Sequence, residues 1–277
     1  VDYHRAEVVG IPMSTTRADL LATAQRSLAA AGAHDRDGWI GLFTDDGRVE
    51  DPVGSQPHRG PIAIWQFYDT FIGPRAITHH PHADIVVGTT VVRDLDLEIQ
   101  MASTLTMQVP TFIRYDLRAD GDELRIARLS AYWELPAMIG QFVRGGLSAV
   151  PAGIALGRAM FSNQGLSGSL GFLSGFRGLG ADGIDLFARF LDESCAGDEI
   201  GVRRLAADIP ITLGDTEPLT TSEFVERLSG GTWDKLIRSG PAVAARIERG
   251  DRHSVVIGDL GTDRAAISRL RVFGDIR

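Results

Sequence analysis

The stretch that decides the fold is Val49-Glu50-Asp51-Pro52-Val53-Gly54-Ser55-Gln56-Pro57-His58-Arg59-Gly60. Pro52 fixes its own backbone and biases Asp51 towards an extended conformation. Gly54 and Gly60 keep the residues between them out of regular structure, and Pro61 suits the first position of a helix. The stretch therefore predicts one carboxylate held by stiff backbone beside a helix, which is a good arrangement for a general base.

Three helices are expected around this turn. Residues 14–32 have apolar side chains at helical spacing, with hydroxyl residues as caps and Gly32 as a stop. Asp35 can cap a second, short helix that carries residues 39–43. A third helix is expected from Pro61 to about Ile72, before a Gly-Pro step.

The apolar spacing then changes to every second residue, which is typical of strands. Residues 95–101 alternate apolar and polar side chains, and the alternation continues through residues 105–118. Asp120-Gly121-Asp122 indicates a hairpin, and residues 124–133 predict the returning strand. Residues 14–135 are therefore expected to form an α+β domain with three helices on a curved antiparallel sheet.

Residues 136–180 differ from this domain in composition, because glycines punctuate an apolar, helix-leaning stretch. Arg144, Arg158 and Arg177 interrupt it, so no transmembrane span is expected. We interpret the stretch as a helical connector between domains. A mobile lid, or a surface helix that touches a membrane or a partner, is the alternative.

Residues 181–277 repeat the first pattern in shorter form, and we interpret them as a degenerate second copy of the domain. Helices are expected over residues 183–193, over 198–205 and after Thr220, and strands over 209–213, 242–249, 254–257 and 265–273. Aligning the prolines of the two copies puts Thr212 opposite Asp51. The second copy is therefore expected to lack the acid, which leaves one site per chain.

Net charge and cysteine count exclude several kinds of partner and site. The formal net charge of −8 and the isoelectric point near 5.4 argue against nucleic acid as a partner. Cys195 is the single cysteine, so an intrachain disulfide and a thiolate metal cluster are excluded. With no secretory signal in the given sequence, we expect a cytoplasmic protein.

Several short motifs resemble the ketosteroid isomerase family of the NTF2-like (SnoaL-like) superfamily. They are Phe43-Thr44-Asp45-Asp46, Val49 to Gly54, Gly60, Phe67-Tyr68 and Ala131-Tyr132-Trp133-Glu134. The resemblance covers residues 18 to 135. With the repeat in residues 181–277, it predicts two tandem cone folds joined by the Gly-rich connector. One face of each sheet needs a cover, so we expect the two sheets to stack as an intrachain pseudo-dimer. Pairing of whole chains as a homodimer is a further hypothesis.

The family's chemistry implies that Asp51 takes a proton from a carbon next to a ketone and returns it elsewhere, without metal or organic cofactor. Apolar walls raise the pKa of such a carboxyl and make it a better base. Tyr68 matches a supporting tyrosine and is the second catalytic candidate. The family's two strong oxyanion donors correspond to Ser27 and Thr111, which are weaker donors. The list of predicted substrate-binding residues is Ser27, Phe43, Trp65, Thr111 and Trp133.

The implied ligand is a small apolar ketone, with a Δ5-3-ketosteroid as the specific example. One alternative is a steroid- or lipid-like ligand-binding protein without activity, because both strong oxyanion donors are missing. Others are a cyclase, a dehydratase or an epoxide hydrolase. The last would use Arg114 with acids such as Asp116, although Asp116 is expected simply to pair with Arg114. His79-His80-Pro81-His82 predicts no metal site, because alternate residues on an extended segment point to opposite faces.

Overall fold

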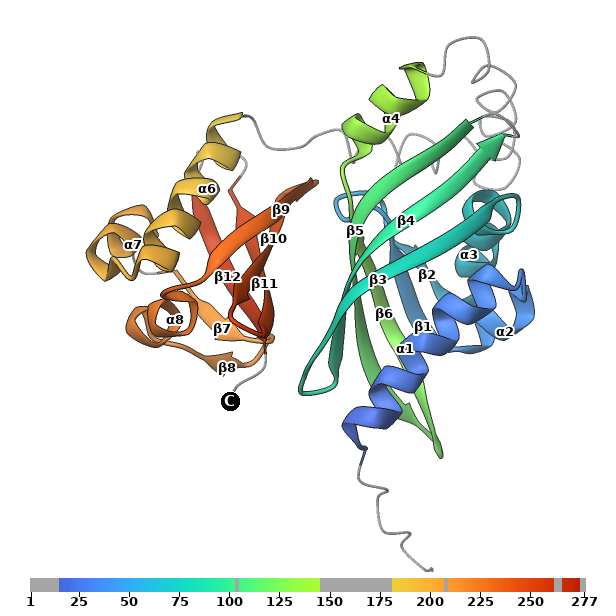
Figure 1. Cartoon of the computed structure of the whole chain (residues 1–277). Helices are drawn as coiled ribbons and strands as arrows, with labels where there is room; N and C mark the ends of the chain where they lie inside the picture. The colour runs from blue at the N-terminus through green and yellow to red at the C-terminus, as the bar shows by residue number, and fades with distance from the viewer. Residues whose placement is uncertain (1–14, 103–104, 145–180, 207–208, 262–265, 275–277) are drawn as a thin grey trace, which may run out of the picture.

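The computed structural model describes residues 15–102, 105–144, 181–206, 209–261 and 266–274. Two six-stranded sheets face each other in the middle of the molecule, and helices cover the outer face of each sheet (Figure 1). The expected α+β architecture of two tandem cone folds is confirmed. Residues 145–180, most of the predicted connector, lie outside the described residues. The lid and surface-helix alternatives concern the same stretch.

The first half contains all three expected helices and six strands. In chain order its elements are α1 (Arg17–Gly32), α2 (Arg36–Gly41), β1 (Phe43–Glu50), β2 (His58–Arg59), α3 (Gly60–Phe67), the π-helix η1 (Tyr68–Ile72), β3 (Ala76–Val87), β4 (Thr90–Ala102), β5 (Leu105–Asp120), β6 (Glu123–Tyr132) and α4 (Leu135–Arg144).

Local chemistry explains where the helices begin. Thr16 and Asp19 form a reciprocal capping box at the start of α1, and the Asp35 carboxylate accepts a hydrogen bond from the Gly38 backbone nitrogen at the start of α2. The second helix ends sooner than expected. Phe43 begins β1, where its side chain packs on Trp39 with ring centroids 4.8 Å apart.

The first sheet has the strand order β2-β1-β6-β5-β4-β3. The hairpin at residues 120–122 joins β5 to β6, with Gly121 at a φ of 62°. The sheet is mixed rather than purely antiparallel, because β1 pairs with β6 in parallel. Strand β3 was not expected as a strand, since the histidine-rich sequence of residues 79–82 breaks the apolar alternation that marks the others.

The second half repeats this arrangement. Its elements are α6 (Ala181–Ala196), α7 (Glu199–Leu205), β7 (Ile211–Leu213), β8 (Glu217–Pro218), α8 (Thr221–Leu228), β9 (Thr232–Ser239), β10 (Ala242–Arg249), β11 (Arg252–Leu260) and β12 (Ile267–Gly274). The strand order β8-β7-β12-β11-β10-β9 is that of the first sheet, position by position. This confirms the expected repeat of the fold and adds β9, which the sequence did not indicate.

The strand register narrows the expected match between Asp51 and Thr212. Val49 pairs with Leu129 in the first sheet and Ile211 pairs with Leu270 in the second, and all four side chains face the helix-covered core of their own half, so Val49 corresponds to Ile211. In the turns that follow, the Val53 nitrogen donates to the Ala131 carbonyl and the Gly214 nitrogen donates to the Val272 carbonyl, so Gly214 corresponds to Val53. The second copy is one residue shorter over this stretch, and the place of Asp51 falls at Thr212 or Leu213. Neither residue is an acid, as expected.

A third apolar core lies between the two sheets, apart from the helix–sheet core of each half. Its buried members come from both halves and are Val53, Ile85, Val92, Phe112, Tyr132, Ile237, Ala242, Ala244, Val255, Ile257 and Phe273. Alternation along each strand sends one set of side chains to the helices and the other set to the facing sheet. Each sheet is thus the cover for the other.

A buried cation also joins the halves. The Lys235 side chain on β9 reaches into the first sheet, where its Nζ lies 2.5 Å from Asp94 Oδ1 and donates to the backbone oxygens of Leu95 and Thr111. Arg246 Nη1 lies 3.2 Å from the other Asp94 oxygen. The Asp94 side chain is 1% exposed, so its charge depends on these two partners.

The backbone of the turn after Asp51 comes very close to the backbone of the second half. A Cβ atom added at Gly240, between β9 and β10, would lie 2.4 Å from the Gly54 Cα. Both glycines have positive φ, 92° at Gly54 and 55° at Gly240. The Ser239 hydroxyl donates to the Val53 carbonyl at 3.1 Å beside this contact. The loop that carries Asp51 therefore rests on the second half.

We expect Gly240→Ala to destabilise the protein by about 2 kcal/mol more than Gly250→Ala, because overpacking adds to the backbone strain. Gly250 is a matched control, since its φ of 62° is similar and an added Cβ would meet nothing within 4 Å. Urea denaturation of both variants measures the difference. Equal losses would mean that the Gly54–Gly240 contact yields without cost.

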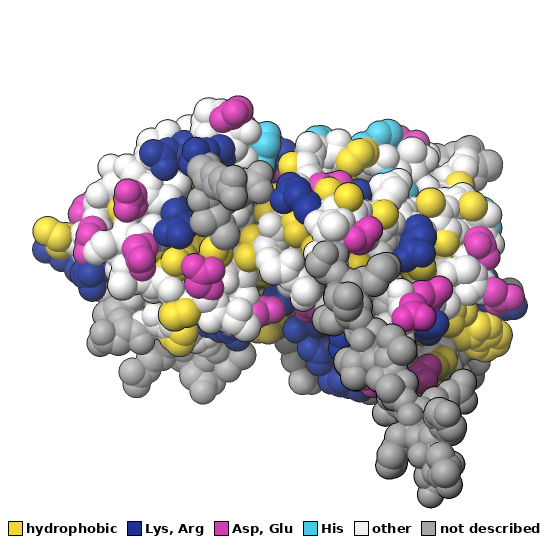
Figure 2. All heavy atoms as spheres, turned by 90° about the horizontal axis from the view of Figure 1, so that it is seen from below, with side chains coloured by type: hydrophobic (Ala, Val, Ile, Leu, Met, Phe, Trp, Pro, Cys, Tyr) yellow, Lys and Arg dark blue, Asp and Glu magenta, His cyan; other side chains and the backbone are white. Residues whose placement is uncertain are grey.

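The surface carries charged side chains of both signs, interspersed over both halves (Figure 2). Within the described part of the chain, no helix is long and apolar enough to cross a membrane.

Candidate functional site

Asp51 follows directly after β1 in a turn fixed on both sides. The Val53 backbone nitrogen donates to the Ala131 carbonyl at 2.8 Å, which ties the turn to β6. The Gly54 nitrogen donates to the Glu50 carboxylate at 2.9 Å and closes the turn on itself. The stiff backbone expected from Pro52 is present, and the Asp51–Pro52 peptide is cis.

The Asp51 carboxylate has a neutral partner and lacks a cationic one among the described residues. The Trp133 indole nitrogen donates to Asp51 Oδ1 at 2.5 Å. Burial raises the pKa of Asp51 to about 6, and the Trp133 hydrogen bond opposes part of that rise. A carboxyl with a pKa near 6 is ionised at neutral pH and is a stronger base than an exposed aspartate.

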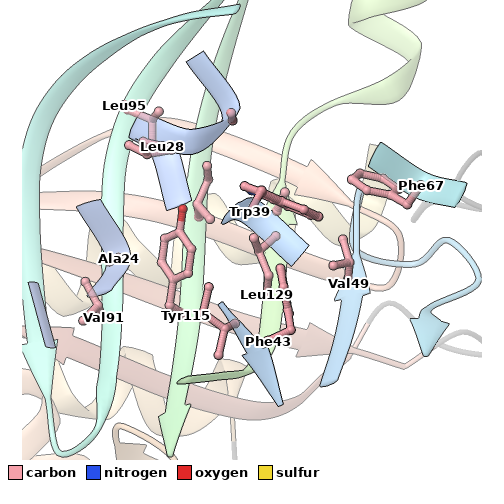
Figure 3. Packing of buried hydrophobic residues seen from close by; sticks show 14 of the residues in the cluster. Ala24, Leu28, Trp39, Phe43, Val49, Phe67, Val91, Leu95, Tyr115 and Leu129 are labelled. Carbon is pink, nitrogen blue, oxygen red and sulfur yellow. The ribbon is translucent and has the colours of Figure 1, made fainter. Parts of the chain in front are cut away.

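Apolar side chains pack around the end of β1, just before Asp51. Figure 3 shows Val49 from β1, Leu129 from β6 and Trp39 from α2 packed together, with Phe67 from α3 alongside. Partly exposed apolar residues continue this core, and their list is Leu21, Ala30, Ile40, Leu42, Phe71, Ile72, Val86, Leu97, Ile99, Met101, Leu124, Met138 and Ile139. The base therefore stands next to a large apolar region.

The Trp133 fluorescence should report the ionisation of Asp51. Because the indole N–H bonds the carboxylate, we expect the emission of the wild-type protein to titrate with a midpoint near pH 6, the pKa given by burial. Asp51→Asn should remove the transition while leaving the other three tryptophans unchanged. A transition that survives in Asp51→Asn, or one centred near pH 4, would contradict the raised pKa.

Tyr68 lies at the start of η1, and its side chain is buried. Its hydroxyl has no hydrogen-bond partner among the described residues. Burial raises the pKa of Tyr68, and the charges that act on it are Asp35, Asp69 and Arg36. These belong to the α2 end of the domain, so no described contact brings Tyr68 to Asp51. Its catalytic role stays a prediction.

The predicted substrate-binding residues fall into two groups. Trp133 contacts Asp51, and Phe43 lies in the same core against Trp39. Trp65 lies on the surface instead: it is 41% exposed, with the Arg36 guanidinium 5.5 Å above its ring. The sequence could not separate these cases, because all three aromatics occupy plausible core positions.

The two predicted weak donors differ in what their hydroxyls do. Thr111 is fully buried on β5, and its hydroxyl donates to the Val109 carbonyl at 2.9 Å. Ser27 is buried on α1, and the Tyr115 phenol lies close to it. Thr111 is thus already engaged, whereas Ser27 faces a phenol that the sequence reasoning overlooked.

Tyr115 is the residue that sequence reasoning missed. It is fully buried on β5, and its hydroxyl points towards α1, near Leu28 (Figure 3). The signal was available, because the alternation along β5 places Tyr115 on the same face as Val109 and Ile113. The family resemblance directed attention to position 27 instead.

Arg114 and Asp116 face the second sheet. The Arg114 Nη2 lies 2.7 Å from Asp116 Oδ1 and also bonds Asp215 of the second half, while the guanidinium lies 5.2 Å from the Phe273 ring centre. The expected pairing of Asp116 with Arg114 is confirmed. The side chains of Arg114 and Asp116 point to the face of the sheet opposite the helix-covered core, so they lie apart from Asp51. They therefore give no support to an epoxide hydrolase site at Asp51.

Two of the histidines of β3 pair with acids on the neighbouring strand β4. His82 Nε2 lies 2.9 Å from Asp96 and His80 Nε2 lies 3.8 Å from Glu98, all partly exposed. His79 is held neutral, since burial lowers its pKa to about 4. No group of three or more histidine, cysteine or acidic side chains in the described ranges is placed to hold a metal ion.

Comparisons with known proteins match the first half of the chain. The family model described as a SnoaL-like domain matches residues 24–129. The Delta 5-3-ketosteroid isomerase from Mycobacterium sp. is 30% identical, over 43% of this chain and 96% of that chain, with a TM-score of 0.39. The RV0760c protein from Mycobacterium tuberculosis, solved in complex with estradiol-17beta-hemisuccinate, is 26% identical over 43% of this chain and 95% of that chain, with a TM-score of 0.39. An LEH-like epoxide hydrolase from M. tuberculosis is 19% identical, with 48% and 96% covered and a TM-score of 0.40.

The matched segment begins within α1 at Ala24 and ends within β6 at Leu129. It contains the turn with Asp51, the buried Tyr115 and most of the first sheet. Residues 24–129 of this chain are a SnoaL-like (NTF2-like) domain.

Proposed function

We propose that the first half is a cofactor-independent isomerase-like enzyme that moves a proton on an apolar ketone, with Asp51 as the general base. The observation that carries the proposal is the Asp51 carboxyl, whose pKa burial raises to about 6 and whose single described partner is an indole N–H. A base held in this way is ionised at neutral pH and poorly solvated, which favours proton abstraction.

In the proposed reaction, Asp51 takes a proton from the carbon next to the ketone. The electron pair of that C–H bond forms the enolate double bond, and the negative charge moves to the carbonyl oxygen. The protonated Asp51 then returns the same proton to a distant carbon of the conjugated enolate. Atoms and charge balance without an oxidant or a second substrate. Trp133 holds the carboxylate in place between the two transfers.

The motifs around Asp51 make a Δ5-3-ketosteroid the first substrate to test. The wild-type protein should convert it to the conjugated enone, followed by the absorbance of that enone. Turnover no faster than in buffer would remove the isomerase proposal in its strict form. A cyclase or a dehydratase would use the same base on another apolar substrate, and the assay separates these from the isomerase.

The second candidate is a steroid- or lipid-like ligand-binding protein without activity. It is favoured by Thr111, whose hydroxyl is engaged with Val109 and so donates little to a ligand. In this case a steroid titration would show saturable binding that Asp51→Asn leaves intact, and no product would form. Product formation abolished by Asp51→Asn would eliminate this candidate.

We also propose the division of the chain into residues 14–135, 136–180 and 181–277, with the first and last packed as an intrachain pseudo-dimer. The shared core between the sheets and the Lys235–Asp94 pair support this. Residues 14–135 produced alone should aggregate or associate, because they would expose that core. A well-behaved monomer of this fragment would contradict the pseudo-dimer. Further pairing of whole chains is tested by light scattering.

A further inference from the structure

We propose that the Tyr115 hydroxyl, together with Ser27, forms the hydrogen-bonding site for the carbonyl oxygen of the ligand and for the enolate oxygen that it becomes. This rests on the proposed function of Asp51 and supplies its missing electrophilic partner. The residues come from facing elements, since Tyr115 lies on β5 and Ser27 on α1.

The Tyr115 hydroxyl is buried in a state that a ligand oxygen would complete. Tyr115 is 0% exposed, and its hydroxyl oxygen has no hydrogen-bond partner among the described residues. Ser27 lies close enough to lower the pKa of the phenol, although the two hydroxyls form no hydrogen bond with each other. A buried polar group without a partner is costly, and it persists where a ligand completes it.

Tyr115 lies on the same sheet as the strand that leads to Asp51. Tyr115 pairs with Leu129, and Leu129 pairs with Val49, two residues before Asp51. The side chains of Tyr115, Leu129 and Val49 face the same apolar core. Two strand spacings separate Tyr115 from the Asp51 strand, about 10 Å in the backbone. In the proposed complex, the ligand lies along this part of the core, with its oxygen at Tyr115 and the carbon that loses the proton at Asp51.

The charges around the Tyr115 phenol suit a hydrogen-bond donor to an oxyanion. Burial raises the pKa of Tyr115 to about 12, Ser27 and Arg93 lower it, and the carboxylates of Asp84 and Asp51 raise it by smaller amounts. The phenol is therefore a neutral donor at neutral pH, where Asp51 is an ionised base. Arg93 is held by two bonds to Asp84 and one to Gln25, so its cation is fixed near the same place. Both features favour a developing oxyanion.

The Tyr68 hydroxyl is the rival donor, since it is also buried without a described partner. The charges acting on Tyr68 are those of Asp35, Asp69 and Arg36, whereas Asp51 acts on Tyr115. The two phenols therefore make different predictions. A substitution at Tyr115 should weaken contacts to the ligand oxygen, and one at Tyr68 should do so only if the rival is correct.

The test compares Tyr115→Phe, Tyr68→Phe and the control Tyr132→Phe, which alters a buried tyrosine facing the second sheet. Equilenin, a steroid with a naphthol group, is the binding probe, and its methyl ether has no hydroxyl that can ionise. Tyr115→Phe should weaken equilenin binding about tenfold, as expected for one hydrogen bond, and leave the ether unaffected. With a substrate that turns over, kcat should fall about 100-fold with little change in KM.

Two further readouts separate this role from a structural one. Tyr115→Phe should melt at the wild-type temperature or above, because it deletes an unpartnered hydroxyl, whereas loss of a structural bond would lower the melting temperature. Unchanged equilenin affinity in Tyr115→Phe, a loss in Tyr68→Phe alone, or no saturable binding of equilenin by the wild-type protein would overturn the inference.

The outcomes also distinguish this inference from the proposed catalysis. If no ketone turns over but Tyr115→Phe still weakens equilenin selectively, the oxygen site stands and the catalytic proposal fails. If Asp51→Asn abolishes turnover while Tyr115→Phe changes neither kcat nor equilenin affinity, the catalytic proposal stands and the oxygen site fails.

Discussion

Asp51→Asn should lower kcat at least 1000-fold with a turned-over ketone, within the range of about 10²–10⁴ that a positioned general base contributes. The amide cannot accept the substrate proton at neutral pH, yet its oxygen can still accept the Trp133 indole N–H. In the wild-type protein, kcat/KM should rise with pH through about 6 and then level off, as the Asp51 carboxyl ionises. The enone absorbance measures both.

The same substitution should stabilise the protein at neutral pH. The folded-state pKa of Asp51 is raised from 3.8 to about 6, so the folded protein binds this proton more tightly than the unfolded chain. Ionisation therefore disfavours the folded state, and wild-type stability falls as pH rises through the interval from 4 to 6. At pH 7 Asp51→Asn should gain up to about 3 kcal/mol, since one pKa unit equals about 1.4 kcal/mol.

Urea denaturation at pH 7 and at pH 4 checks this second effect, because the gain should vanish where both states are protonated. Asp46→Asn is a control, since Asp46 is largely exposed and bonds Arg118 at the surface. A loss of stability in Asp51→Asn at pH 7 would show that the carboxylate is a structural partner of Trp133 rather than a base kept at a cost to the fold.

Asp94→Asn should cost about 3 kcal/mol of unfolding free energy, as removal of one partner from a buried ion pair does. The change leaves the Lys235 ammonium 9% exposed, with Arg246 nearby and without the charge that both contact. Lys235 also sits in a left-handed backbone conformation with a φ of 46°, which its contacts with the first sheet help to hold.

The matched control for Asp94→Asn is Asp234→Asn. Asp234 bonds the same Arg246 but is 53% exposed, so its loss should cost less than about 1 kcal/mol. Urea or thermal denaturation gives both values. Similar costs for the two variants would mean that the buried pair adds no more than a surface pair. Limited proteolysis of Asp94→Asn should also release the halves more readily.

Much of the fold could be predicted because its elements have local causes. Thr16, Asp35 and Thr220 each cap a helix where the sequence suggested, and the turn at residues 120–122 joins two strands as expected. Asp51 was found for the same reason, since a proline and two glycines shape its turn without help from distant residues.

The rest depended on contacts that no local pattern carries. Strand β9 was missed because Lys235 interrupts its apolar alternation, and that lysine makes sense only against Asp94 in the other half. Likewise, the sequence shows Tyr115 on an inward-facing position, but its unpartnered hydroxyl beside Ser27 appears only once α1 lies across β5. Trp65 was assigned inward although its helix turns it outward.

The loss of the acid at Thr212-Leu213, within two identical strand orders, has a consequence for how the chain tolerates mutation. The second half must keep its sheet face and its own core, but it has no acid to orient at this position. In a deep mutational scan selected for activity, the residues around Leu213 should accept any apolar side chain of similar volume. The residues around Asp51 should accept almost none, so two halves with one architecture would diverge at different rates.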